Sequence, residues 1–106
     1  MKTVAFELSM PNPPSWNRRW SGEDRLWVLC RRLKDDLASR IAAAAPYRYR
    51  WSDGWVASIS ARLVDFKEAA KLKRKSSGFQ GYEWMVSSII EHGKIITESE
   101  LRKETA

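Results

Sequence analysis

Alternation of apolar and polar residues is clearest between Tyr47 and Val64. In the first part of this stretch, aromatic residues at 47, 49 and 51 alternate with Arg48 and Arg50, which gives a strand one aromatic and one cationic face. Asp53-Gly54 then supplies the positive φ that a two-residue hairpin loop requires. Apolar alternation resumes afterwards at Trp55, Ala57, Ile59, Ala61 and Leu63. The stretch 47–64 therefore predicts a β-hairpin.

Three further segments have strand character. In the first, the apolar residues Val4, Phe6, Leu8 and Met10 alternate with mostly polar ones. The prolines within residues 11–14 end this strand. The second, Leu26–Arg32, is apolar for most of its length, which predicts a strand buried on both faces. The third, Lys94–Thr97, predicts a short final strand.

Helical periodicity appears in three segments. Lys34–Ala45 has an apolar residue every four positions, two aspartates near its start and Pro46 after its end. Residues 66–75 are strong helix formers behind a possible N-cap at Asp65, with a thin apolar stripe of Phe66, Ala69 and Ala70. Gly81–His92 predicts a third helix with Gly93 at its C′ position. Its inward positions are Tyr82, Met85, Val86, Ile89 and Ile90.

These elements predict an α+β domain: an antiparallel sheet of four to five strands with two to three helices packed on one face. A chain of 106 residues is sufficient for one hydrophobic core, so we expect a single domain over residues 1–97. Residues 98–106 read as a charged tail that frays at its end. Residues 15–24 have no periodicity and predict an irregular loop.

The charge balance narrows the classes of partner. A net charge of +6 favours acidic partners, either nucleic acid or an anionic protein surface. No run approaches the roughly 20 apolar residues of a membrane span, so no membrane partner is expected. The single cysteine leaves no intramolecular disulfide and Glu7 interrupts the apolar start of the chain, so we expect a reducing, cytoplasmic location.

Candidates for catalysis are few. Cys30 lies in a predicted strand, where a free cysteine usually acts as a small buried hydrophobe. His92 is the only histidine, and its place at a helix end suits the last carbonyls. The two side chains form the only possible nucleophile and base pair, and we expect a protein that is not an enzyme. We also expect no metal and no cofactor, because one histidine and one cysteine give too few soft ligands.

Two groups of residues favour binding. Trp16, Arg18, Arg19 and Trp20 share the predicted loop, and Trp and Arg are common in interfaces and in contacts to bases and phosphates. The alternative is that both tryptophans fold back and plug the core. The second group, on the predicted helix 66–75, is Lys71, Arg74 and Lys75. A secondary group on the outer sheet face is Arg48, Arg50 and Arg62.

Two motifs, in residues 15–23 and 78–86, resemble those of small uncharacterised proteins encoded by bacteriophages. The first reads Ser15-Trp16-Asn17, followed here by Arg18 where that pattern has glycine, and the second runs from Gly78 to Val86. The resemblance implies an accessory protein in the cytoplasm of an infected bacterium that inhibits a host defence complex, as anti-CRISPR proteins do. Its partner would be a host protein or nucleoprotein with an acidic surface. The alternatives are a protein that binds single-stranded nucleic acid through the tryptophan loop and the lysine helix, and an enzyme using Cys30 and His92. The sequence leaves the oligomeric state open.

Overall fold

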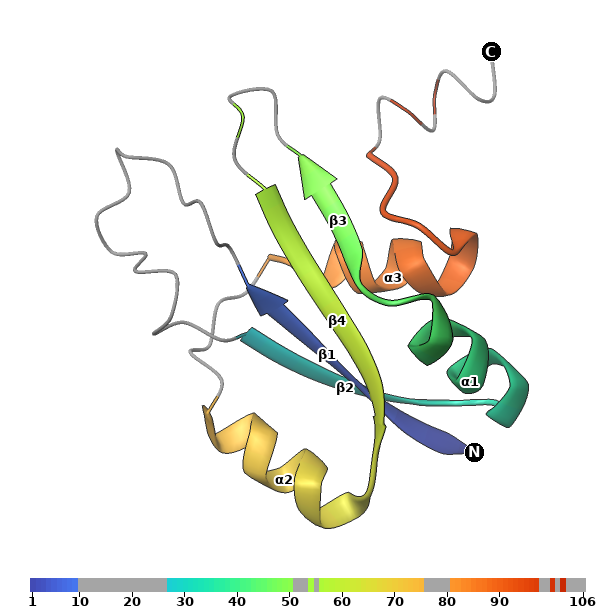
Figure 1. Cartoon of the computed structure of the whole chain (residues 1–106), viewed down its shortest axis with the longest axis vertical. Coiled ribbons are helices and arrows are strands. Elements are labelled where there is room, and N and C mark those ends of the chain that lie inside the picture. Colours follow the sequence, from blue (N-terminus) through green and yellow to red (C-terminus); the bar gives the residue numbers. More distant parts are fainter. Residues whose placement is uncertain are drawn as a thin grey trace.

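The computed structural model describes residues 1–9, 27–50, 54, 56–75, 81–97, 100 and 102 (Figure 1). These residues form an α+β fold with a four-stranded antiparallel sheet in the order β2-β1-β4-β3 and three helices. The strands are β1 (Lys2–Ser9), β2 (Trp27–Leu33), β3 (Tyr47–Arg50) and β4 (Val56–Val64). The helices are α1 (Asp35–Ala44), α2 (Phe66–Lys75) and α3 (Glu83–His92).

The strand β1 lies at the centre of the sheet, where its alternating pattern is satisfied on both sides. Phe6 is opposite Leu29 of β2 and Ala61 of β4, and Leu8 is opposite Trp27 and Ile59. All of these side chains point to the same face, because residues opposite one another in a sheet share a face. This face, the core face, carries the larger of the two hydrophobic clusters.

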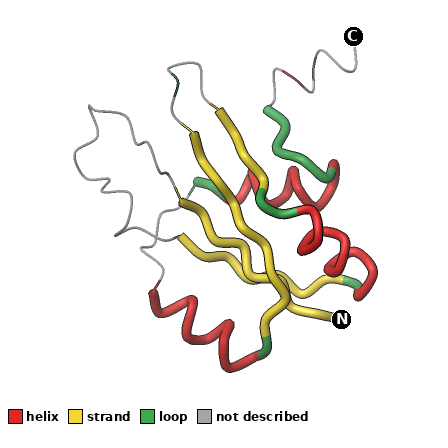
Figure 2. The backbone as a smooth tube through the Cα atoms, in the orientation of Figure 1, coloured by secondary structure: helices red, strands yellow, loops and turns green. Residues whose placement is uncertain are grey.

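The core face is covered by α1 and α3, which contact each other (Figure 2). α1 contributes Ala38 and Ile41 to the cluster, and α3 contributes three fully or almost fully buried side chains, Met85, Val86 and Ile89. The antiparallel pairing of the predicted hairpin strands is confirmed, but the two-residue Asp53-Gly54 loop is not: Arg50 is opposite Val56, and the odd number of residues between them does not fit a regular ladder closed by a two-residue loop. Tyr47 is buried and donates a hydrogen bond from its hydroxyl to the carbonyl of Ile41, at 2.8 Å. Gly54 has the expected positive φ of 93°, and the neighbouring Asp53 lies outside the described residues.

The two helices α1 and α3 on the core face agree with the predicted two to three helices on one face, and the opposite, outer face carries α2. Ala5 of β1 and Val28 of β2 point to this side and are buried together with Leu72 of α2. Small residues at these positions allow a helix to approach the sheet closely. α2 accordingly stands apart from α1 and α3 (Figure 1). The prediction of a second strand buried on both faces holds at its start, where Trp27 faces the core and Val28 faces α2.

Both predicted helix signals from single residues are present. The Asp65 carboxylate accepts a hydrogen bond from the Glu68 amide at 2.8 Å, as an N-cap does. Gly93 adopts a left-handed φ of 73° after α3, and its amide donates to the Ile89 carbonyl at 2.9 Å.

Two predictions about local structure are wrong. The stripe of Phe66, Ala69 and Ala70 is not the buried side of α2, because Leu72 faces the sheet and the Phe66 side chain is 88% exposed. The segment 94–97 is not a strand. Two of its backbone groups are hydrogen-bonded to the Ser88 side chain instead of to a neighbouring strand. The Ser88 hydroxyl donates to the Lys94 carbonyl at 2.8 Å and accepts from the Ile96 amide at 2.6 Å. The adjacent Ile95 and Ile96 are both buried, which an alternating strand on a half-exposed surface does not allow.

Candidate functional site

The position of α2 on the outer face is fixed by one apolar contact and one ionic network. Leu72 provides the apolar contact to Ala5 and Val28. On the flank of the helix that faces β4, the Arg62 guanidinium bonds to the carboxylates of Glu7 and Glu68. Its Nε lies 3.3 Å from Glu7 Oε2, and the Ser60 hydroxyl donates to the same oxygen at 3.4 Å. This network joins β1, β4 and α2 and sets which sides of α2 face solvent.

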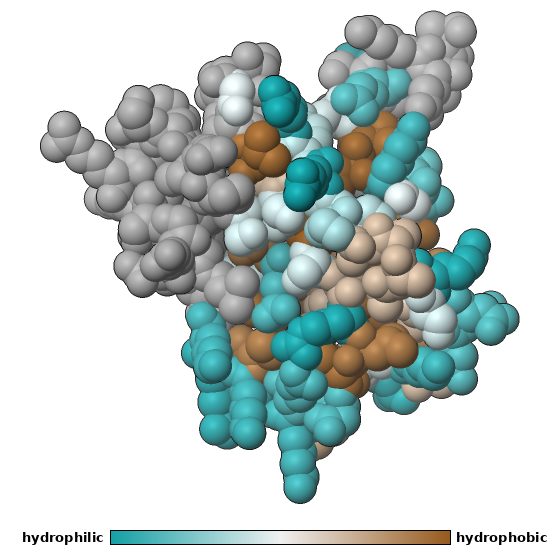
Figure 3. All heavy atoms as spheres, viewed as in Figure 1, coloured by the Kyte–Doolittle hydropathy of each residue, from teal (hydrophilic) through white to brown (hydrophobic). Residues whose placement is uncertain are grey.

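The orientation of α2 determines where its lysines and its arginine lie. Lys71 and Lys75 lie three and seven residues after Glu68, so they share the flank that faces β4. Arg74 lies next to this row, and all three side chains are exposed. Figure 3 shows the region over α2, at the lower left, as mainly hydrophilic. The predicted supporting charges are therefore available to a partner.

The part of the outer face that α2 leaves uncovered is polar. Arg48 and Arg50 of β3 point to this side, and Arg48 is opposite Ser58 of β4. Ser58 in turn is opposite Ser9, and Ser60 is opposite Glu7, so short hydroxyl side chains form the floor. The result is a surface with arginines along the β3 edge, serines between, and the lysines of α2 on the other side. We call this the cationic surface: Arg48, Arg50, Lys71, Arg74 and Lys75.

The cationic surface is not neutralised by neighbouring carboxylates. Within the part of the chain that the structure describes, none of its five side chains forms an ion pair. Two acidic groups beside α2, Glu7 and Glu68, are both engaged by Arg62. Arg62 itself, a predicted secondary contact, thus holds α2 in place. Positive charge that is left unpaired over two elements attracts polyanions or acidic protein surfaces.

The remaining predicted contact residues belong to the tryptophan loop. Trp16, Arg18, Arg19 and Trp20 lie outside the described residues, so their role as contacts stays a prediction. Ser9 and Trp27, the described residues on either side of segment 10–26, are paired one position apart at the same end of β1 and β2. The loop therefore leaves and re-enters the sheet at one end.

The two enzyme candidates lie on opposite faces of the sheet. Cys30 belongs to the outer face beside α2, and burial raises the pKa of its thiol, which disfavours the reactive thiolate. His92 is the last residue of α3 on the core face, with its Nε2 3.7 Å from the Glu91 carboxylate. The structure does not bring Cys30 and His92 together. Among the described residues no group of three or more His, Cys, Asp or Glu side chains is arranged to hold a metal ion.

Two grooves were not anticipated from the sequence. One, of about 820 Å³, lies along the other flank of α2 and includes Phe66. The other, of about 630 Å³, lies between β3 and α3, where the rings of Tyr49 and Trp84 meet edge to face at 5.5 Å. The sequence does contain a signal for the first groove. Phe66 is followed at i+3 and i+4 only by alanines, so it has no large apolar partner on its own helix face.

Comparison of the chain with protein-family models, with curated proteins and with solved structures gave no match. The helices in the described ranges are all too short or too polar to cross a lipid bilayer. Function is therefore argued from the side chains of the outer face.

Proposed function

We propose that this protein is a non-enzymatic binding protein that attaches its cationic surface to an acidic surface of a macromolecular partner. The observation that carries the proposal is a set of five cations from β3 and α2 on one face of the sheet, none of which is ion-paired within the described residues. The nearby carboxylates are engaged by Arg62, so the positive potential of this face is not cancelled locally.

The partner is a protein or nucleoprotein complex. Protein interfaces combine a polar, charged rim with an apolar centre. The outer face offers both, the lysines on one flank of α2 and the exposed Phe66 on the other. Following the resemblance to bacteriophage-encoded proteins, we propose that the partner is a host defence complex of the CRISPR-Cas kind and that binding inhibits it in the bacterial cytoplasm.

Capture of the partner from a bacterial lysate tests this proposal. The wild-type chain is compared with a triple variant, Lys71→Glu, Arg74→Glu and Lys75→Glu. These side chains are exposed, so the variant should fold normally, while association with an acidic surface should slow by about tenfold or more. Mass spectrometry identifies the captured proteins, and the association rate is then measured with the purified partner.

The matched control reverses three exposed cations away from the outer face, with Arg31→Glu, Lys34→Glu and Arg40→Glu. It makes the same change in net charge, so it separates a local contact from overall charge. The proposal fails if both triple variants reduce capture equally, or if neither reduces it.

A second candidate function, binding of single-stranded nucleic acid, is supported by the same arginines and lysines, which suit phosphates. Its test is the affinity for an oligothymidylate over a series of salt concentrations. If phosphates are the partners, log Kd varies linearly with log salt, and the outer-face triple variant lowers the slope by about 0.7 for each lost contact. No measurable binding at low salt rules this function out.

A further inference from the structure

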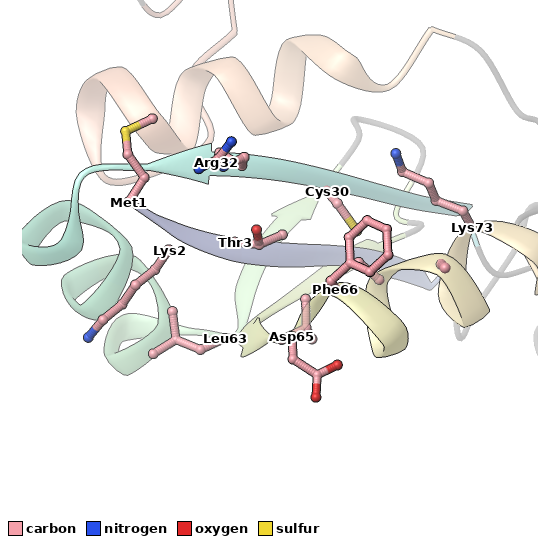
Figure 4. Close-up of a pocket in the computed structure, with 12 residues that line it drawn as sticks. Met1, Lys2, Thr3, Cys30, Arg32, Leu63, Asp65, Phe66 and Lys73 are labelled. Carbon is pink, nitrogen blue, oxygen red and sulfur yellow. The ribbon is translucent and has the colours of Figure 1, made fainter.

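The groove along the second flank of α2 is formed by residues from three parts of the chain (Figure 4). Its floor is made by the outer-face residues Thr3, Cys30 and Val64, and one wall by Ala69 and Ala70 of α2. The volume of about 820 Å³ is open to solvent along its length, as expected of a groove and not of a closed ligand cavity.

Three large apolar side chains that line this groove are exposed. Phe66 is 88% exposed, Met1 70% and Leu63 42%. In the described part of the chain only one other large hydrophobic residue, Trp84, is classed as exposed. Figure 4 shows the Phe66 ring standing out from the start of α2 at the groove, in the direction of Cys30. An exposed aromatic ring beside a concave apolar surface is the usual form of an interface anchor.

The rim of the groove is positively charged. Lys2, Arg32 and Lys73 line it, and the one carboxylate among its lining residues, Asp65, is used to cap α2. Figure 4 shows Lys73 and Arg32 at separate positions along β2, so the charges are spread along the groove. An apolar floor with cations spread along its rim complements a segment that has apolar side chains on one side and carboxylates beside them.

We infer that this groove docks an acidic amphipathic peptide segment of a protein partner. The inference rests on the proposed function and deepens it, because it names the class of segment that the partner presents. The exposed Phe66 provides the apolar contact, and Arg32 and Lys73 pair with carboxylates of the segment.

Charge argues against the other occupants. In a two-fold dimer through this groove, Lys2, Arg32 and Lys73 would approach their own copies, which like-charge repulsion disfavours. Nucleic acid would match the charge, but Phe66 is the one aromatic residue among the lining residues, so the groove provides no row of rings on which successive bases stack. Both occupants remain distinguishable outcomes of the experiment below.

The test is a selection of random peptides displayed on yeast for binding to the immobilised full chain, with counter-selection against Phe66→Ala. We expect the surviving peptides to combine apolar residues with aspartate or glutamate. One of them, made synthetically with a fluorophore, should lose about tenfold or more in affinity to Phe66→Ala and to Lys73→Glu. Arg40→Glu, on the core-face helix α1, is the charge control and should bind as the wild type does.

Several outcomes would overturn the inference. Enrichment of neutral or basic peptides, or equal affinity of Phe66→Ala and wild type for the selected peptide, would contradict the acidic peptide. Displacement of the peptide by an oligothymidylate with higher affinity would indicate nucleic acid as the occupant. Self-association that Phe66→Ala abolishes would indicate a second copy of the chain. Since Phe66 is almost fully exposed, an unchanged melting temperature of Phe66→Ala shows that a loss of binding is not a loss of folding. If partner capture fails for the outer-face triple variant but not for Phe66→Ala, the groove inference is wrong and the proposed function stands.

Discussion

The two faces of the sheet are built on different principles. On the core face, Phe6, Leu8 and Ile59 are completely buried beneath α1 and α3. On the outer face, the buried cluster consists only of Ala5, Val28 and Leu72, with Cys30 and Val64 packed against it. Because the stabilisation from burial scales with apolar area, most of the stability must come from the core face.

The outer face, in contrast, holds one helix with few contacts and leaves the rest of its surface available. α2 is attached through Leu72 and through the ionic network of Arg62. Both of its other flanks carry side chains that the fold itself does not use, the lysine row on one and Phe66 on the other. The stability therefore lies mainly on one face and the unused side chains on the other, and three substitutions and one labelling experiment test this difference.

Phe6→Ala should have the largest effect. Its side chain is fully buried between β2 and β4, and removing it leaves a cavity that the core cannot fill. We expect the free energy of unfolding to fall by about 3–5 kcal/mol, as measured by urea denaturation. A loss below about 1 kcal/mol would contradict the view that the core face carries the stability.

Leu72→Ala should cost less, about 2 kcal/mol, because α2 can settle onto the small residues Ala5 and Val28. Amide hydrogen exchange is the sharper measurement. The amides of α2 should lose protection while those of β1 keep theirs, since α2 opens separately from the core. Equal loss of protection in both elements would mean that the two faces form one cooperative unit.

Arg62→Ala should cost about 1 kcal/mol, since Arg62 and Glu68 are both more than 40% exposed and screened by solvent, while Glu7 is 16% exposed. The difference from wild type should shrink at high salt. Arg48→Ala is the matched control, because Arg48 is an exposed arginine of the same face without an ion pair in the described structure. If the two variants have equal stability, the network does not hold α2.

The smallest effect concerns the thiol of Cys30. Burial raises its pKa, so at about pH 8 a smaller fraction is thiolate than in a free peptide cysteine. Alkylation by iodoacetamide should therefore be slower than for a cysteine peptide, and should accelerate as the pH rises above the ordinary thiol pKa. In Leu72→Ala the rate should move toward that of the peptide. A wild-type rate equal to that of the peptide would show that α2 does not shield Cys30.

The pattern of apolar and polar residues predicted most secondary-structure elements and part of the candidate site. Alternation predicted the central strand and the paired strands of the hairpin, and the cap signals at Asp65 and Gly93 were both correct. The exposed cations of α2 and β3 could also be named from the sequence, since charged residues at alternating or four-residue spacing rarely face a core. Pattern failed at Phe66, because hydrophobicity shows that a residue favours burial but not whether any surface is present to bury it.

The sequence by itself determined which positions are apolar, that the chain is basic and where the four strands and three helices of the fold lie, although it also predicted a strand at 94–97 that is absent. Only the tertiary structure decided that α2 lies on the face opposite α1 and α3, and so which residues meet. It engages Arg62 with Glu7 and Glu68, separates Cys30 from His92, and opens a groove beside Phe66. The physical reason is that the placement of a helix depends on small differences between the two faces of the sheet. Here Ala5 and Val28 make the outer face apolar enough for Leu72 of α2 to pack against it.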